Sequence, residues 1–146
     1  MITQIRDETG TQRLVGYVVE VGHPDGRARC WLDLDERHLN RHNVLHGGIA
    51  TMLMDSASGA TGSLTVDDTG LVPFMSVSLN VQFIASGKPG RVTAVGAITG
   101  GGRSLKFISA EWHHEDGTLI ATCSGIFTRV PQERLPCALP GANQRH

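Results

Sequence analysis

The sequence contains few charged residues, few cysteines and no long apolar run, and each of these features argues against certain partners or cellular locations. Charged residues make up 18% of the 146 residues and the net charge is −1, so we expect no nucleic-acid partner and no membrane partner. The three cysteines, Cys30, Cys123 and Cys137, form no Cys-x-x-Cys pair and predict a reducing, cytoplasmic location. The polar N-terminus has no apolar run after its first charges, so we expect no signal peptide.

Several catalytic signatures are also missing from the sequence. No Gly-x-Ser-x-Gly motif is present, which argues against Ser-His-Asp hydrolysis, and the glycines at 100–102 are not followed by the Lys-Ser/Thr of a P-loop. His38 and His42 have the four-residue spacing of helical metal ligands, but no His-Glu-x-x-His motif accompanies them. We therefore expect two solvated histidines, no metal site and no redox cofactor.

The segment 40–62 carries most of the information in the chain. Apolar residues after His46-Gly47-Gly48 fall on every face of a predicted helix, which is typical of a helix buried within the protein. The segment is too short and too interrupted to span a membrane, which takes about 20 mostly apolar residues. At the predicted helix start, the N–H of Gly47 has no partner within the helix and carries the positive end of the helix dipole. Such a group suits an anion or a developing oxyanion.

A single acid, Asp55, interrupts this apolar segment. No Lys or Arg lies between Gly47 and Leu71, so no cation can pair with Asp55 within the helix. A buried, unpaired carboxylate is costly, and such acids concentrate at functional sites, so one interpretation is a catalytic carboxylate. The other is a structural acid bonded to the backbone or to the hydroxyl of Thr51, Ser56 or Ser58.

Gly47 and Asp55 are eight residues apart, which corresponds to about 12 Å along one helix. A nucleophile must come within about 3 Å of the carbonyl carbon while the oxyanion donor holds the carbonyl oxygen. One chain therefore cannot bring both groups to one carbonyl. Either the two groups serve different sites, or Gly47 of one subunit faces Asp55 of the other across a two-fold dimer.

The motif L-H-G-G-x-x-x-x-L-x-D, formed by residues 45–55, resembles the signature of the hotdog-fold acyl-CoA thioesterases in the PaaI-like and THEM2-like branch. The segments 76–90 and 100–127 are similar to two later strand motifs of the same family and occur in the same order. The likeness covers residues 14–130. It implies an α+β hotdog fold, in which an antiparallel sheet wraps around one long central helix.

The resemblance also implies roles for individual residues. Asp55 is expected to act as the nucleophile or as the general base that activates water, and the Gly47 N–H to polarise the thioester carbonyl. His46, Asn40 and Ser76 are expected to position the reactants. On the residues alone, His46 is also explained as a helix cap, Asn40 as a turn residue and Ser76 as an ordinary strand residue.

Three further residues are candidates for substrate binding. Gly48 lies beside the oxyanion donor in the motif. Arg103 and Lys106 flank the predicted hairpin turn at 100–102 and could contact coenzyme A phosphates. Plain solvated charges explain Arg103 and Lys106 equally well.

The pattern of turns and apolar residues predicts one domain over 14–130, with a loose segment at 1–13 and a tail at 131–146. In the strand predicted at 72–85, alternation places Val77, Leu79, Val81 and Phe83 on one face. Short turns between strands favour an antiparallel sheet that covers the helix. The predicted strands are Leu14–Val21, Arg27–Leu34, Val72–Ala85, Arg91–Thr99, Ser104–His113 and Thr118–Arg129.

The function implied by the resemblance is hydrolysis of an acyl-CoA thioester to a carboxylate and free CoA by a dimer or a dimer of dimers. One alternative is a hotdog hydratase or dehydratase, which resembles these proteins but uses a His and an acid at a different spacing. A second alternative is a non-catalytic acyl-CoA-binding module, which the intact Asp55 argues against. Release of free thiol from an acyl-CoA separates the first function from both alternatives.

Overall fold

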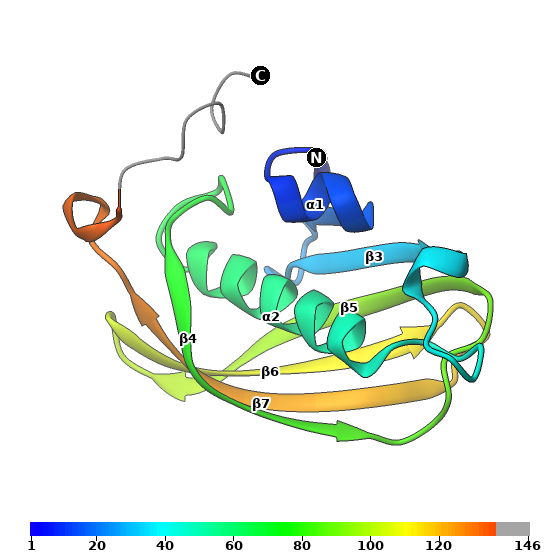
Figure 1. Cartoon of the computed structure of the whole chain (residues 1–146). Coiled ribbons are helices and arrows are strands. Elements are labelled where there is room, and N and C mark those ends of the chain that lie inside the picture. Colours follow the sequence, from blue (N-terminus) through cyan, green and yellow to red (C-terminus); the bar gives the residue numbers. More distant parts are fainter. Residues whose placement is uncertain (137–146) are drawn as a thin grey trace.

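The structure is a computed structural model that describes residues 1–136, so Cys137 and most of the predicted tail lie outside the described residues (Figure 1). One long helix lies against a single curved sheet, as the sequence predicts. In chain order the elements are β1 (Thr3–Ile5), α1 (Gly10–Val15), β2 (Val18–Val21), β3 (Arg29–Leu34), the 3-10 helix η1 (Glu36–His38), α2 (Gly47–Ser63), β4 (Phe74–Phe83), β5 (Gly90–Gly101), β6 (Leu105–His114), β7 (Leu119–Arg129) and the 3-10 helix η2 (Gln132–Arg134).

The sheet has seven strands in the order β1-β2-β3-β5-β6-β7-β4, and every neighbouring pair is antiparallel. The sheet curves around α2, and α1 lies across α2 from β6 and β7 (Figure 1). The strand that follows the helix, β4, is one of the two edge strands over residues 1–136, because its only neighbour there is β7, and β1 is the other. Helix and edge strand therefore lie next to each other at one border of the molecule.

Helix α2 is largely buried, which confirms the prediction from its apolar composition, and only the side that carries Met52, Asp55 and Ser56 is half-buried. No residue from Ile49 to Ser63 is exposed. Leu53, Met54 and Ala57 are at most 1% exposed and pack in the main core with Ala94 and Trp112 from the sheet. Burial of this kind, not helix propensity, supplies most of the stability of a helix that contains several Gly and Ser residues. Within residues 1–136, no helix combines the length and the apolar character needed to cross a membrane.

The helix and β5 approach each other most closely at Gly96. A Cβ atom on Gly96 would clash with the Thr61 hydroxyl and would lie 2.8 Å from the carbonyl oxygen of Ala57. The Thr61 hydroxyl donates to the Ala57 carbonyl at 2.7 Å and accepts from the Ala28 N–H at 3.0 Å. The missing side chain thus makes room for the hydrogen bonds that connect α2 to the start of β3.

The N-terminal segment 1–13, which the sequence predicts to be loose, contains a strand and the start of a helix in the structure. Residues 3–5 form β1, which pairs with β2, and residues 10–15 form α1. The predicted strand at 14–21 begins only at Val18, because Leu14 and Val15 end α1 and Gly16 follows in the left-handed conformation that suits a helix C-terminus. Sequence alternation missed these elements because both are short and mostly polar.

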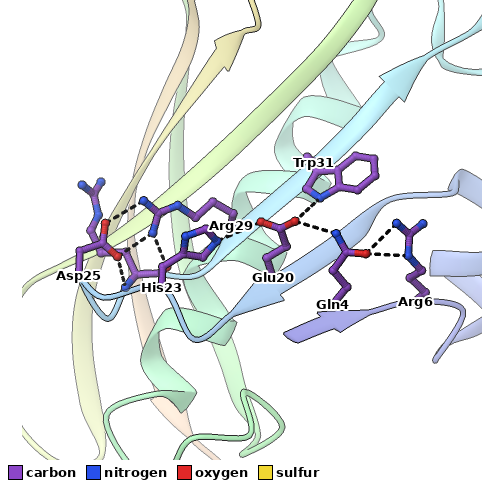
Figure 2. A network of polar contacts seen from close by, with 8 residues as sticks. Gln4, Arg6, Glu20, His23, Asp25, Arg29 and Trp31 are labelled. Atoms are coloured by element: carbon purple, nitrogen blue, oxygen red, sulfur yellow. Dashed lines mark hydrogen bonds and ion pairs between the residues drawn. The ribbon is translucent and has the colours of Figure 1, made fainter. Parts of the chain in front are cut away.

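A polar network attaches β1 to the rest of the sheet (Figure 2). The Glu20 carboxylate accepts three hydrogen bonds at 3.0 Å, from Gln4 Nε2, His23 Nε2 and Trp31 Nε1. The Trp31 ring also packs against the Arg91 guanidinium, 3.7 Å from the ring centroid. The N-terminal strand is therefore held by side-chain hydrogen bonds as well as by its short ladder, which explains why a polar segment is ordered.

A β-bulge in β4 changes which of its residues face the helix. The register with β7 shifts between Ser76 and Ser78, and Val77 is 62% exposed, so the prediction that Val77 shares a face with Leu79 and Val81 was wrong. Leu79 and Val81 both pack against the core and so lie on one face, as predicted. An extra residue reverses the alternation within a strand, and sequence periodicity does not reveal where such a residue lies.

We expect Gly96→Ala to lower the free energy of unfolding by about 1–3 kcal/mol, because the added methyl group meets the fixed carbonyl of Ala57. Urea unfolding measures this change. Gly102→Ala is the matched control, since a Cβ there has no neighbouring atom within 4 Å. Equal stability of the two variants would contradict the close approach of β5 to α2.

Candidate active site

The first turn of α2 is built by His46, which is the N-cap residue. Its Nδ1 accepts a hydrogen bond from the Gly48 N–H at 2.9 Å, so a neutral imidazole carries its proton on Nε2. The ring lies so close that a Cβ on Gly48 would be 3.0 Å from it. The capping role considered for His46 is therefore observed, and a substrate contact by Gly48 cannot use its N–H.

The Gly47 N–H is left as the free donor at this helix start. No hydrogen bond to it occurs among the described residues, and it lies at the positive end of the helix dipole. Gly47 lines an open cleft of about 350 Å³ together with Phe83, Ile84 and Ile120. The Phe83 ring is packed on the glycine, since a Cβ on Gly47 would lie 3.1 Å from ring atom Cζ. The cleft thus offers an unoccupied N–H beside an aromatic wall.

The approach to the helix is fixed by His38, which is 1% exposed, so the expected solvated pair of histidines was wrong for this residue. Its Nδ1 accepts from the Asp35 N–H at 3.0 Å and its Nε2 contacts the Val15 carbonyl at 2.7 Å. The His38 carbonyl in turn accepts the His46 N–H at 2.9 Å. His38 thereby connects α1, η1 and the N-cap of α2, whereas His42 is exposed as expected.

Asn40 forms the turn that leads into the cap. Its side-chain Oδ1 accepts from the His42 N–H at 2.9 Å, and its backbone N–H donates to the Val44 carbonyl at 2.8 Å. The turn role considered for Asn40 is thus observed. Its carbonyl oxygen is already used there, so a role in positioning a reactant, which stays a prediction, falls to the side-chain NH₂ group.

Asp55 is half-buried in the middle of α2 and lines a second cleft, of about 290 Å³. Burial raises the pKa of Asp55 above its ordinary value of 3.8, and the nearby Ser76 hydroxyl offsets part of that shift. None of the three hydroxyls of the structural alternative bonds Asp55 among the described residues. The Thr51 hydroxyl donates to the Gly47 carbonyl, the Ser56 hydroxyl bonds Tyr17, and the Ser58 hydroxyl is buried without a partner. Asp55 therefore retains an incompletely compensated carboxylate facing a cleft.

The two clefts do not meet at one point within the chain. Gly47 lines only the first cleft and Asp55 only the second, and both residues belong to one continuous helix. Strand β4 runs alongside both, with Ser76 close to Asp55 near its start and Phe83 against Gly47 at its end. The structure therefore brings Asp55 and Ser76 together and keeps them apart from the free N–H of Gly47.

Arg103 and Lys106 lie at the tip of the β5–β6 hairpin, at the end of the sheet opposite the start of α2 (Figure 1). Lys106 Nζ donates to the Gly102 carbonyl at 2.6 Å, and neither residue lines the cleft of Gly47 or the cleft of Asp55. Their contact with CoA phosphates stays a prediction.

Tyr17 and Phe83 were not identified as site residues from the sequence. Tyr17 lines the Asp55 cleft from the far N-terminal segment, and Phe83 covers Gly47 from the end of β4. No sequence motif connects either residue to the helix, because both contacts are made only when distant segments pack together. Within residues 1–136, no three His, Cys, Asp or Glu side chains are grouped as a metal site requires.

Comparisons with known proteins identify the relatives of this chain. The family model of the thioesterase superfamily matches residues 42–121. Acyl-coenzyme A thioesterase 13 of Homo sapiens is 30% identical over 112 residues, which cover 75% of this chain and 78% of the relative.

Solved structures show the same architecture. The BH2602 protein from Bacillus halodurans, solved with CoA, has a TM-score of 0.77 and 23% identity, with 87% of this chain and 82% of that chain covered. The PaaI protein of the E. coli phenylacetic acid degradation operon has a TM-score of 0.68 and 18% identity, with 82% and 83% covered. At these identities the likeness concerns the fold, and it confirms the predicted hotdog fold.

We expect Asp55→Asn to increase the free energy of unfolding at neutral pH. Burial disfavours the ionised carboxylate in the folded state, so above its folded pKa the wild-type protein carries a cost that the amide lacks. Urea unfolding at pH 7 and near pH 4 measures the difference, which should shrink on acidification as Asp55 becomes protonated. A less stable variant at pH 7 would instead show that Asp55 is a structural hydrogen-bonding partner.

Proposed function

Because this chain belongs to the thioesterase superfamily and is a thioester hydrolase, we propose that it hydrolyses acyl-CoA at a site shared by two subunits. One observation carries the proposal: a free Gly47 N–H and a half-buried Asp55 lie on one helix but open into different clefts. The choice of an acyl-CoA substrate follows from the name of the human relative.

In the proposed reaction, the Gly47 N–H of one subunit donates to the thioester carbonyl oxygen and stabilises the negative charge that develops there. Asp55 of the partner subunit either attacks the carbonyl carbon or activates a water molecule that does so. In the first route the C–S bond breaks, CoA leaves as a thiolate, and water then cleaves the acyl–aspartate anhydride. Both routes yield a carboxylate and free CoA, and neither requires a metal or a redox cofactor.

The edge strand β4 supports a dimer of this geometry. Its free edge exposes apolar side chains: Met75 is 48% exposed, Val77 62% and Phe83 58%. Long apolar edge strands pair readily with another chain. If two copies of β4 pair antiparallel about a two-fold axis, the start of one strand lies beside the end of the other. That pairing brings the Asp55 and Ser76 end of one subunit towards the Gly47 and Phe83 end of the other.

The same proposal assigns roles to the other predicted site residues. His46 holds the first turn of α2 so that the Gly47 N–H points outward, and Ser76 and the Asn40 side-chain NH₂ group position the carboxylate and the attacking water. Arg103 and Lys106 supply positive charge for the CoA phosphates. A dimer of dimers and a cytoplasmic location remain predictions.

We expect Gly47→Pro to lower kcat by about 100- to 1,000-fold, because proline removes the oxyanion-donating N–H. Proline suits this first helical position, and His46 already has the extended backbone favoured before proline (φ −68°, ψ 127°). Gly47→Ala is the control, since it places a Cβ at the same position against Phe83 but keeps the N–H. Thiol release from acyl-CoA is the measurement, and equal losses in both variants would contradict the oxyanion role.

The shared site is tested by coexpressing Gly47→Pro and Asp55→Asn chains, each of which should be inactive alone. A hybrid dimer has one site with both native groups and one site with neither, so random pairing should restore about a quarter of wild-type activity. A site contained within one chain would give no recovery, and that result would overturn the proposal.

We expect the acid limb of the kcat/KM profile to lie above pH 3.8, because the reaction needs ionised Asp55 and burial raises the pKa of that carboxyl. Ser76→Ala should move the limb to still higher pH, since the Ser76 hydroxyl lowers the pKa of Asp55. Ser78→Ala, two residues along the same strand, should leave the limb unchanged. If the acid limb does not move in Ser76→Ala, the Ser76 hydroxyl does not stabilise the ionised Asp55 carboxylate, and this prediction is wrong.

A further inference from the structure

The two residues that precede helix α2, Leu45 and His46, are held by carbonyl groups of two other segments. The Leu45 N–H donates to the Gly87 carbonyl at 3.3 Å, and the His46 N–H donates to the His38 carbonyl at 2.9 Å. The free N–H of Gly47 belongs to the peptide bond that follows His46. Because a peptide bond is planar, the direction of this N–H depends on how the two preceding residues are held.

The first of these carbonyls is fixed by the ring of its own residue, His38. The ring is 1% exposed, and its Nδ1 accepts the Asp35 N–H at 3.0 Å. Its Nε2 lies 2.7 Å from the Val15 carbonyl, which can only accept, so Nε2 carries the proton. One buried ring thus connects the end of α1 to the start of η1, directly beside the carbonyl that holds His46.

The second carbonyl belongs to the loop between β4 and β5, which His114 holds in place. This ring is 7% exposed, and its Nε2 lies 2.9 Å from the carbonyl of Pro89, two residues beyond Gly87. Its Nδ1 lies 3.1 Å from both the N–H and the carboxylate oxygen of Asp116. The loop lies so close to Leu45 that a Cβ on Gly87 would be 2.5 Å from the Leu45 Cβ. A second buried ring therefore fixes the loop that holds Leu45.

We propose that His38 and His114 are positioning residues for thioester hydrolysis, which fix the direction of the Gly47 N–H through the two backbone hydrogen bonds that precede it. The inference rests on the proposed function, in which this N–H stabilises the developing oxyanion, and it adds two residues that do not touch the substrate. Neither ring lines the cleft of Gly47 or that of Asp55, so their effect on the rate passes through the backbone.

The first turn of a helix needs such support because its N–H groups have no partner within the helix. An oxyanion donor is effective when it already points to the place where the charge develops, and a displacement of about 1 Å lowers a rate by about 100-fold. The His46 side chain accepts only the Gly48 N–H, so it leaves the preceding backbone to other groups. Histidine suits this task because its ring offers a donor and an acceptor at a fixed separation.

The test replaces each buried histidine by leucine, which removes both ring hydrogen bonds. We expect His38→Leu and His114→Leu each to lower kcat for thiol release from acyl-CoA by about 10- to 100-fold, because the donor is then misdirected. KM should change by less than about twofold, since the donor acts mainly in the transition state. Glutamine, which keeps a side-chain N–H near the position of Nε2, should restore most of the loss at either position.

Two more accessible histidines in the same segments provide matched controls. His42 is exposed on the approach to α2, and the side chain of His113, next to His114, is 39% exposed. His42→Leu and His113→Leu should leave kcat unchanged. Urea unfolding establishes for every variant that the protein is folded under the conditions of the assay.

A double-mutant cycle separates positioning from general damage to the fold. Gly47→Pro has no N–H to direct, so adding His38→Leu or His114→Leu should change its remaining kcat by less than about twofold. A loss of the same size in the wild-type and Gly47→Pro proteins would show a merely structural role and would overturn the inference. Leucine variants with full activity would overturn it as well.

Gly87→Ala tests the same path with both histidines in place, and it decides the question if a leucine variant does not fold. The added Cβ displaces Leu45, so kcat should fall in the wild-type protein and stay unchanged in Gly47→Pro. Unchanged kcat in a folded Gly87→Ala protein would overturn the inference and leave the proposed function intact. No thiol release from any acyl-CoA by the wild-type protein would overturn both.

Discussion

The rigidity of α2 is the constraint on which the proposed chemistry depends. A helix holds its residues at fixed spacing, so the Gly47 N–H and the Asp55 carboxylate stay about 12 Å apart whatever the surrounding loops do. The sheet and the N-terminal segment together cover this helix so that no residue from 49 to 63 is exposed, and packing on both sides holds the helix in place. If both groups act on one carbonyl, a second copy of the chain is required, with the Gly47 N–H from one subunit and the Asp55 carboxylate from the other.

The same enclosure sets the electrostatics of the site. The segment from Gly47 to Leu71 contains no cation, and burial raises the pKa of Asp55 because water can no longer solvate the carboxylate fully. An ionised group in such a place lowers the free energy of unfolding, and the hydrogen bond from the Ser76 hydroxyl offsets only part of that loss. A half-buried acid beside an open cleft is thus a feature that stability alone does not explain, and its retention is understandable if the carboxylate reacts.

The N-terminal segment adds a second layer to this core. Glu20, Gln12 and His38 each join separate chain segments through side-chain hydrogen bonds, and together they place β1, α1 and η1 around the helix. This layer forms the wall of the Asp55 cleft that faces away from the sheet.

The sequence by itself determined the central helix, the four long strands after it and the candidate acid. These follow from local chemistry. A helix with apolar residues on every face must be buried, and alternating strands joined by tight turns form an antiparallel sheet. An unpaired acid within an apolar helix is costly and therefore indicates a functional site. Only the tertiary structure shows that the N-terminal segment forms β1 and α1, that His38 is buried and that Val77 points outward. It also places Phe83 at the cleft of Gly47 and Tyr17 at the cleft of Asp55. Each of these depends on contacts between residues far apart in the chain or on a one-residue shift in strand register, and neither leaves a periodic signal in the sequence.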